Sequence, residues 1–485
     1  MIAMSAMAFI IAVISYRDQS EKALLSSVVV CFIFVAIMFV YERKLINSKI
    51  LNYVVFAVCL VEMGINANTG VKTVTVTGYS NYPRNSESVS DLIGSVESED
   101  NGFYRIETMS NYTINDPALY GYKGVSQFSS TANVNVTNIM KSLGLQASAA
   151  GNRYYYNQNT AVINMFLNLK YLISHDSYSG DLTYLDPLAS KDGVSIYENN
   201  HYLPIGFAAE SSISEYKGES FIQFDNQNEL FRLATGIEED VLTRVDIKDV
   251  GHKGLNVIKS GYGNYSYQYS APDDGSEDCY LKFNYTVPDD GPLYVTFDFG
   301  EIKNVRIKVG DSVMRTHSSG KYMDIFAAGD FNAGDVVSFQ ADAKDQKNGS
   351  GTIYVYQINS DVFERGYRKL LEGALNVTKY DDTIIKGNII AEDDCLMYTS
   401  IPYDGGWKAY VDGKETEVQS IKNAFVCVPM SAGEHTVELR YCPPGFVVGA
   451  VISILSVATL VLLWIFVPKV KKKRFMSGEG TAENK

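Results

Sequence analysis

Two charged residues lie inside apolar stretches, where a charge is costly unless it binds something. Glu62 is the only acid within the three apolar runs near the N-terminus, and Lys170 is embedded in the segment LNLKYL. An ionisable residue at membrane depth is a functional candidate, although Glu62 lies near the outer end of its run and could instead reach interfacial water. Lys170 is expected to have a partner or to extend its ammonium group into solvent. A phosphate contact is its functional alternative.

Arg105 and the tyrosines are the other side chains suited to ligand binding. The segment FYRIET (103–108) alternates apolar and charged residues, which places Arg105 and Glu107 on one face of a strand. Arginine binds phosphate in a bidentate manner, whereas a structural Arg105–Glu107 pair is the alternative. Tyr120 and Tyr122 offer aromatic faces on which sugars stack, but tyrosine also packs well in strands. The candidate substrate-binding residues are Glu62, Arg105, Tyr120, Tyr122 and Lys170. No catalytic residue is assigned.

The remaining composition excludes several classes of protein. The five histidines are isolated, and no HExxH, P-loop, GxGxxG or GxSxG motif occurs, so we predict no metal and no cofactor. The net charge is −14 and no basic stripe occurs outside the C-terminal tail, which argues against a nucleic-acid partner. The six cysteines form no CxxC motif. A Cys427–Cys442 disulfide is one arrangement that the sequence leaves open.

The elements that must position these residues include membrane helices. Residues 445–467 carry no charge and are followed by a run rich in Lys and Arg, which is typical of a spanning helix whose far end stays in the cytoplasm. Three further apolar runs occupy Met1–Tyr16, Ala23–Tyr41 and Ile50–Ile65. The basic link at 42–49 is predicted to be cytoplasmic. Both ends of the intervening chain are therefore expected outside the cell, which predicts a multi-pass protein with a cytoplasmic C-terminus.

The first apolar run is unusual because it begins at Met1, is short for a span and lacks a basic n-region. We interpret the chain as the C-terminal part of a larger polytopic protein, with a short or tilted first span as the alternative. The fold class that we predict is a membrane protein with transmembrane α-helices, an extracytoplasmic α+β domain and two β-sandwich-like domains. Alternating strands separated by turn signals indicate the sandwiches. The predicted parts are three transmembrane helices (1–68), a tether (69–100), the α+β domain (101–259), a β-sandwich (260–360), a second β-sandwich-like domain (361–443), a transmembrane helix (444–468) and a basic tail (469–485).

Several segments, taken in order, resemble the YfhO family of bacterial membrane proteins. They are FYRIET (103–108), GYKGVSQFSST (121–131), LNLKYLIS (167–174), YENNHYLPIGF (197–207), SIPYDGGWKAYVDGKE (400–415) and AFVCVPMSAGEHTVELRYCPPGF (424–446). The resemblance implies a role in glycosylation of the cell envelope, because members resemble GT-C glycosyltransferases. Such enzymes move sugar from a polyprenyl-phosphate donor to an acceptor outside the membrane, and lipoteichoic acid is the acceptor suggested for the family.

The chain also departs from the family pattern. Members have more spans than the four seen here, and their catalytic acid lies in a first outer loop that this chain lacks, so that acid is not carried over. Under the resemblance, Glu62 would bind sugar hydroxyls of the donor or a partner span. The predicted partners are membrane lipid, a polyprenyl-phosphate sugar donor and a cell-wall polymer. The competing hypothesis is a non-catalytic, membrane-tethered module that binds glycan or serves as a structural part of the envelope.

Overall fold

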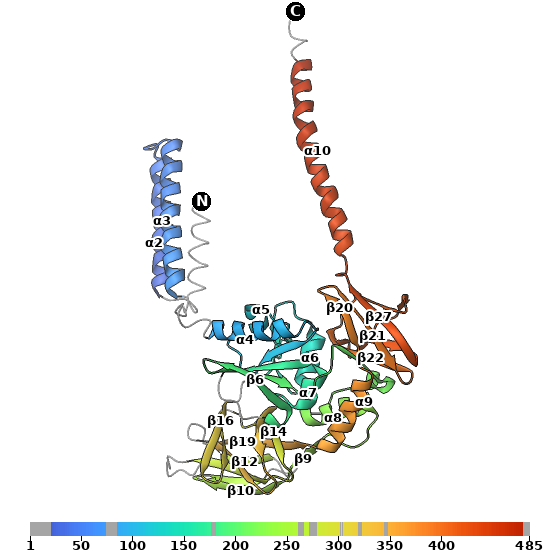
Figure 1. Cartoon of the computed structure of the whole chain (residues 1–485). Helices are drawn as coiled ribbons and strands as arrows, with labels where there is room; N and C mark the ends of the chain where they lie inside the picture. Colours follow the sequence, from blue (N-terminus) through green and yellow to red (C-terminus); the bar gives the residue numbers. More distant parts are fainter. Residues whose placement is uncertain are drawn as a thin grey trace, which may run out of the picture. The chain divides into compact units, whose positions relative to one another are not determined.

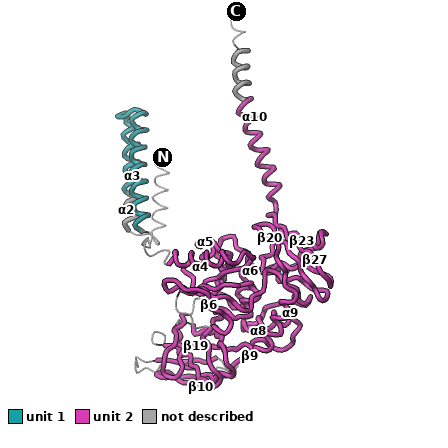
Figure 2. Tube along the Cα trace, viewed as in Figure 1, with its two compact units in different colours: residues 1–84 teal, residues 85–485 magenta. Residues whose placement is uncertain are grey.

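We describe the fold from a computed structural model, which describes residues 21–73, 85–175, 181–259, 266–270, 279–300, 302, 304–318, 323–343 and 348–478. The chain divides into two compact units, residues 1–84 and 85–485 (Figure 2). The predicted first apolar run at 1–16 and the last residues of the basic tail lie outside the described residues.

The described part of the first unit consists of two helices that contact each other, α2 (Glu21–Glu42) and α3 (Ser48–Thr73) (Figure 1). They coincide with the apolar runs predicted at 23–41 and 50–65. In the turn between them Asn47 accepts a hydrogen bond from the Ile50 amide through its side chain (2.9 Å), which caps the start of α3.

Two helices in the described part of the chain are long and apolar enough to cross a membrane. They are Ser48–Lys72 within α3 and Phe446–Phe466 within α10 (Phe446–Gly478), while the apolar stretch Val29–Glu42 of α2 is shorter. The helix α10 follows the last β-strand of the second unit after only four residues, 442–445. The side chains of its apolar stretch are almost all exposed, as expected of a helix whose environment is lipid.

The second unit begins with an α+β part built on a four-stranded sheet of order β1-β5-β7-β6. The pair β1–β5 is parallel and the other pairs are antiparallel. A three-stranded sheet of order β2-β4-β3 and several helices complete this part. The elements are α4 (Ser86–Glu99), β1 (Arg105–Thr108), α5 (Asp116–Tyr120), β2 (Gln127–Phe128), α6 (Val134–Ser142), β3 (Gln146–Ala147), β4 (Arg153–Tyr155), α7 (Ala161–Phe166), β5 (Leu169–Ser174), η3 (Leu182–Tyr184), β6 (Leu185–Lys191), β7 (Val194–Asn199), η4 (Ser211–Glu215) and α8 (Gln223–Thr235).

The predicted tether at 69–100 is wrong for much of its length. Its first residues continue α3 to Thr73, and its last residues form α4. The apolar residues of α4 recur at helical spacing and are buried against β6 and β7. These residues are Val89, Leu92, Ile93 and Val96. Most serines and glutamates of this segment lie toward the solvent side of an amphipathic helix, although Ser88 is buried, and this polar composition concealed the helical periodicity.

A β-sandwich follows, with two antiparallel sheets around a dense aromatic and aliphatic core. One sheet has the order β10-β13-β18-β15-β16, and the other has β11-β12-β19-β14-β17 with β9 paired to β19. Its strands begin at Leu242 rather than at residue 260. They are β9 (Leu242–Arg244), β10 (Ile247–Lys253), β11 (Asn256–Lys259), β12 (Ser266–Ser270), β13 (Tyr280–Thr286), β14 (Gly291–Asp298), β15 (Asn304–Val309), β16 (Ser312–Ser318), β17 (Phe326–Phe331), β18 (Val336–Asp342) and β19 (Asn348–Ile358).

The second sandwich combines strands from two distant parts of the chain. Its sheets have the orders β20-β21-β27-β23-β24 and β25-β26-β22-β8. The strand β8 comes from the α+β region and pairs with β22, so the boundary predicted at residue 361 does not separate two independent folds. The elements are β8 (Gly206–Glu210), α9 (Ser360–Glu372), β20 (Asn376–Asp381), β21 (Ile384–Ala391), β22 (Cys395–Pro402), β23 (Trp407–Val411), β24 (Lys414–Thr416), β25 (Gln419–Ile421), β26 (Phe425–Met430) and β27 (Gly433–Tyr441).

Candidate functional site

A β-bulge in the parallel pair β1–β5 determines where Lys170 points. Arg105 is paired with Leu169, but the next residue of β1, Ile106, is paired with Tyr171. Lys170 is therefore the extra residue of the bulge, and bulges redirect side chains next to functional sites. The side chains of Lys170 and Tyr171 consequently reach the same acceptor instead of pointing to opposite faces of the sheet.

That acceptor is Asp100, the residue directly after α4. Its Oδ2 accepts hydrogen bonds from Lys170 Nζ (2.6 Å) and from the Tyr171 hydroxyl (3.0 Å), while its Oδ1 accepts one from the Gly102 amide (2.8 Å). Partial burial opposes ionisation of Asp100, but these hydrogen bonds outweigh it and hold its pKa below the ordinary value. The Lys170 and Asp100 side chains are 22% and 21% exposed, so the pair is reachable from solvent.

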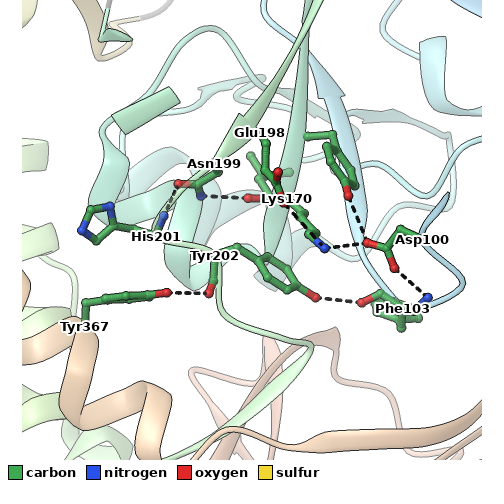
Figure 3. Close-up of polar contacts among 11 residues, drawn as sticks. Asp100, Phe103, Lys170, Glu198, Asn199, His201, Tyr202 and Tyr367 are labelled. Carbon is green, nitrogen blue, oxygen red and sulfur yellow. Dashed lines mark hydrogen bonds and ion pairs between the residues drawn. The ribbon is translucent and has the colours of Figure 1, made fainter. Parts of the chain in front are cut away.

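The ammonium group of Lys170 also lies beside a second acid and two aromatic rings (Figure 3). Glu198 Oε1 is 3.8 Å from its Nζ. The ring centroids of Tyr171 and Tyr202 are 5.3 and 5.5 Å away, which is cation–π distance. Tyr202 is fixed in place because its hydroxyl donates to the Phe103 carbonyl (2.7 Å).

A second lysine lies on a second pair of rings nearby. Phe103 and Tyr380 pack edge to face with centroids 5.5 Å apart, and Lys123 Nζ lies 6.0 and 5.0 Å from their centroids. Tyr104 in turn packs edge to face on Tyr171 at 5.0 Å. Lys123 is exposed and makes no ion pair with any described residue. We name this set the aromatic–lysine cluster: Asp100, Phe103, Tyr104, Lys123, Lys170, Tyr171, Glu198, Tyr202 and Tyr380.

The cluster draws residues from both the α+β part and the second sandwich. Asp100 follows α4, Phe103 and Tyr104 lead into β1, and Tyr380 comes from β20. Tyr202 follows β7, and its carbonyl accepts a hydrogen bond from the Tyr367 hydroxyl of α9 at 3.3 Å (Figure 3). The relative position of the rings is thus fixed by the packing of the two parts. Such an arrangement can hold a ligand that carries both sugar rings and negative charge.

Arg105 is a structural residue in this geometry. Its Nη1 donates to the Gly124 carbonyl (3.1 Å) and its Nη2 to the Ser400 carbonyl (3.2 Å), which ties β1 to β22. The alternative of an Arg105–Glu107 pair is wrong, because the two residues form no ion pair within the described chain. Glu107 instead accepts hydrogen bonds from the amides of Val125 (2.8 Å) and Ser126 (2.7 Å). Burial lowers the pKa of Arg105 and raises that of Glu107.

The tyrosines predicted to stack on sugars lie largely in the protein interior. The Tyr122 side chain belongs to a core cluster, with 6% of the residue exposed, and its hydroxyl donates to Glu107 Oε1 (3.4 Å). A buried ring offers no face to a sugar, so the sugar contact predicted for Tyr122 is replaced by packing. Tyr120 is half-buried against the same core. Glu62 lies on α3 in the first unit and is half-buried there.

Of the five predicted binding residues, Lys170 alone belongs to the aromatic–lysine cluster. Sequence reasoning missed Asp100, which was assigned to the tether, and Tyr202, which lies in one of the segments that carried the family resemblance. Asp100 directly follows α4 and Tyr202 lies in the loop after β7, and functional side chains are common in such loops. The disulfide between Cys427 and Cys442 does not form: both thiols are free, the first buried and the second exposed.

Fold and site together define a membrane-anchored protein with a β-rich body that carries an ionic and aromatic surface cluster. The model of the family described as "Bacterial membrane protein YfhO" matches residues 1–453. The chain therefore belongs to the YfhO family. It is similar to the "Uncharacterized protein YfhO" of Bacillus subtilis (strain 168), with 25% identity over 421 residues that make up 79% of this chain and 45% of the relative. The chain thus spans less than half the length of that relative.

Among solved structures, similarity is weak. A family 35 carbohydrate binding module from Clostridium thermocellum is 12% identical, with 24% of this chain and 96% of that chain covered and a TM-score of 0.18. A GH2 beta-galacturonidase from Eisenbergiella tayi bound to galacturonate is 11% identical, with 41% and 38% covered and a TM-score of 0.16. Scores this low carry no argument about this chain.

Proposed function

We propose that this chain acts in glycosylation of the bacterial cell envelope and that its β-rich body holds the acceptor polymer at the aromatic–lysine cluster. The supporting observation is that Lys123 and Lys170 each lie on a pair of aromatic rings, and that Lys170 also lies beside the carboxylates of Asp100 and Glu198. In this proposal sugar moves from a polyprenyl-phosphate donor to a surface polymer such as lipoteichoic acid. No residue of this chain is assigned to the bond-making step.

The cluster suits an anionic glycan for chemical reasons. Aromatic faces contact the apolar faces of sugar rings, and the partly exposed rings of Phe103 and Tyr380 are the ones available for this. Lys123 can approach a phosphate because no described carboxylate occupies it. Asp100 and Glu198 accept hydrogen bonds from sugar hydroxyls, while Lys170 keeps the two carboxylates together.

The topology that serves this function places the body outside the cell. The apolar stretch of α10 is followed by Lys469, Lys471, Lys472, Lys473 and Arg474, which favour the cytoplasmic side. The basic link at 42–49 leads to the same orientation for the end of α3. A multi-pass arrangement with an extracytoplasmic body and a cytoplasmic C-terminus is therefore part of the proposal, and Glu62 is assigned to hydroxyls of the donor sugar or to a partner span.

The second candidate function is a non-catalytic, membrane-tethered module that binds glycan. The observation that favours it is that the cluster lies in the β-rich body and needs no transfer chemistry to bind. The two candidates differ in one measurable respect. Binding without transfer leaves the sugar content of the envelope polymer unchanged when the protein is removed.

The test is complementation of a bacterial strain that lacks the protein. The sugar content of its lipoteichoic acid is measured after expression of the natural protein or of its Lys123→Gln variant. Lys141→Gln is the matched control, because Lys141 is also an exposed lysine of the body but lies on α6 outside the cluster. We expect the natural protein and the control to restore the sugar and Lys123→Gln to restore less. Unchanged decoration in the deletion strain would refute the glycosylation role.

A further inference from the structure

The turn that precedes β23 is bound tightly to the point where the chain leaves the body for the membrane. Trp407 on β23 is paired in register with Tyr441, the last residue of β27, and their ring centroids are 4.9 Å apart. The Cys442 amide donates to the Gly406 carbonyl (3.0 Å). The turn at residues 404–406 and the end of β27 are therefore held together.

Asp404 and Gly406 hold the turn at 404–406 firmly against the end of β27. The Asp404 carboxylate accepts hydrogen bonds from the Gly406 amide (2.7 Å) and from the Tyr441 hydroxyl (3.2 Å). A Cβ at Gly406 would lie 2.4 Å from the Cys442 carbonyl oxygen, so only glycine allows this approach. Both oxygens of the acid are thus engaged within the protein.

The chain segment between the end of β27 and the start of α10 is short. Four residues separate Tyr441 from Phe446, where α10 and its apolar stretch begin. Five Cα–Cα steps span at most roughly 18 Å even when fully extended, and Pro443 and Pro444 restrict this link further. The polar headgroup region on each side of a bilayer is roughly 5–8 Å thick. The end of β27 must therefore lie close to the lipid surface whenever α10 spans a bilayer.

We propose that Trp407, Tyr441 and the turn at 404–406 form a lipid-facing surface that rests in the headgroup layer where α10 enters the bilayer. Trp and Tyr are enriched at this depth because each has an apolar ring and a polar group. Trp407 and Tyr441 are both half-buried, so part of each residue remains exposed at the surface of the body. The surface is independent of the aromatic–lysine cluster and of the glycosylation role, and its partner is the bilayer.

The chain offers a direct reporter because it contains only two tryptophans, Trp407 and Trp464. In the full chain carrying Trp464→Phe, Trp407 is the sole indole. The protein is reconstituted into vesicles of phosphatidylethanolamine and phosphatidylglycerol that contain lipids with a nitroxide quencher either at the headgroup or deep in the acyl chain. Emission is compared with that in vesicles without nitroxide and after addition of acrylamide, a quencher dissolved in water.

The matched control moves the indole to a part of the body outside this surface. It carries Trp407→Phe, Trp464→Phe and Ile258→Trp, since Ile258 is 68% exposed on β11 of the first sandwich. We expect the headgroup nitroxide to reduce Trp407 emission more than the deep nitroxide does. The indole of the control should respond to acrylamide and to neither lipid.

A second reporter protects the test against a local defect. It carries Trp407→Phe, Trp464→Phe and Tyr441→Trp, and we expect the same preference for the headgroup quencher. The chain with Trp407→Phe alone verifies insertion, because Trp464 lies within the apolar stretch of α10. If α10 is inserted and both reporters behave like the Ile258→Trp control, or respond more to the deep quencher, the proposal is wrong.

Discussion

The ammonium nitrogen of Lys170 lies 2.6 Å from a carboxylate oxygen of Asp100, although 70 positions separate the two residues in the chain. The contact joins the end of α4 to the bulge of β5. Because Tyr171 donates to the same oxygen, one carboxylate fixes both the helix end and the bulged strand. The pair is therefore the element on which the geometry of the aromatic–lysine cluster depends.

Replacing Asp100 by asparagine should lower stability. A hydrogen bond to a charged group contributes about 1.5–3 kcal/mol, and the partial exposure of this pair reduces the expected loss to about 1–2 kcal/mol. Chemical unfolding of the full chain in detergent measures it. Asp91→Asn is the control, because Asp91 pairs with Lys191 on the exposed surface, where an ion pair contributes about 1 kcal/mol or less. Equal losses in the two variants would contradict a special role for the Asp100 pair.

The same pair predicts a pH dependence. The pKa of folded Asp100 is lowered, so its ionised form stabilises the native state above the ordinary pKa of the unfolded chain, about 3.9. This contribution is lost as the pH falls through the folded pKa. The stability difference between the natural chain and Asp100→Asn should be constant near neutral pH and shrink in acid. A difference that grows as the pH falls from neutrality would show that another group dominates.

Lys123→Gln should weaken binding of an anionic glycan. Loss of one charge-assisted contact of about 1.5 kcal/mol corresponds to about a tenfold rise in Kd. Binding of purified lipoteichoic acid to the full chain measures it, with Lys141→Gln as the control. The difference between the natural chain and Lys123→Gln should decrease with added salt, since exposed charges are screened. A loss of the same size in Lys141→Gln would point to the overall charge of the body rather than to the cluster.

Gly406→Ala should destabilise the end of the second sandwich. The added methyl group would lie 2.4 Å from the Cys442 carbonyl oxygen and 2.8 Å from Cε2 of Tyr441, so backbone must move. Overpacking of this kind costs about 1–3 kcal/mol. Gly405→Ala is a close control, because its Cβ would meet no atom within 4 Å. Unfolding of the two variants under identical conditions distinguishes this contact from a general effect of losing a glycine in the turn.

Features set by neighbouring residues could be predicted from sequence, and features set by distant ones could not. The Asp412–Gly413 turn joins β23 to β24, and both residues adopt the positive φ (52° and 76°) that this dipeptide favours in hairpins. The sequence predicts a partner for Lys170 as one of two alternatives, but the identity of that partner, Asp100, depends on the bulge and on α4. The periodicity of α4 was present in the sequence and was hidden by its serines and glutamates. The pairing of β8 with β22 could not be predicted, because the two strands are far apart in the sequence and neither segment carries a local pattern that indicates its partner.

In the candidate site, too, the residue types could be predicted from the sequence, whereas contacts between distant residues could not. Aromatic rings and lysines are visible in sequence, but the meeting of Phe103 with Tyr380 requires that β20 of the second sandwich pack beside the entry to β1. Tyr120 and Tyr122 are predicted as sugar contacts because they lie close together in the chain. Tertiary packing places Tyr122 in the core. Tyr202 contributes to the cluster instead, and its position is fixed by hydrogen bonds with Phe103 and Tyr367, which are distant from it in the sequence.

Asp324 is a buried acid between the α+β part and the first sandwich. Its Oδ2 accepts hydrogen bonds from the side-chain amides of Gln146 (2.9 Å) and Asn157 (2.7 Å). Burial raises its pKa to about 6, because two neutral donors do not compensate for the lost hydration of the charge. A raised folded pKa means that the acid favours the native state at low pH, and this contribution is lost as the pH rises through about 6.

Asp324→Asn keeps an acceptor oxygen for the two amides and removes the titration. The natural chain should therefore lose stability between about pH 4 and pH 6 relative to the variant, and the variant should be equally or more stable at pH 7. Chemical unfolding at pH 4, 5, 6 and 7 in detergent measures this difference. Asp330→Asn is a useful comparison, because Asp330 is less buried and its carboxylate is bound by the Thr183 amide and hydroxyl. If Asp324→Asn is less stable than the natural chain at pH 7 by the same amount as at pH 4, Asp324 does not titrate in this range, and its ionised form is stabilised by the two amides.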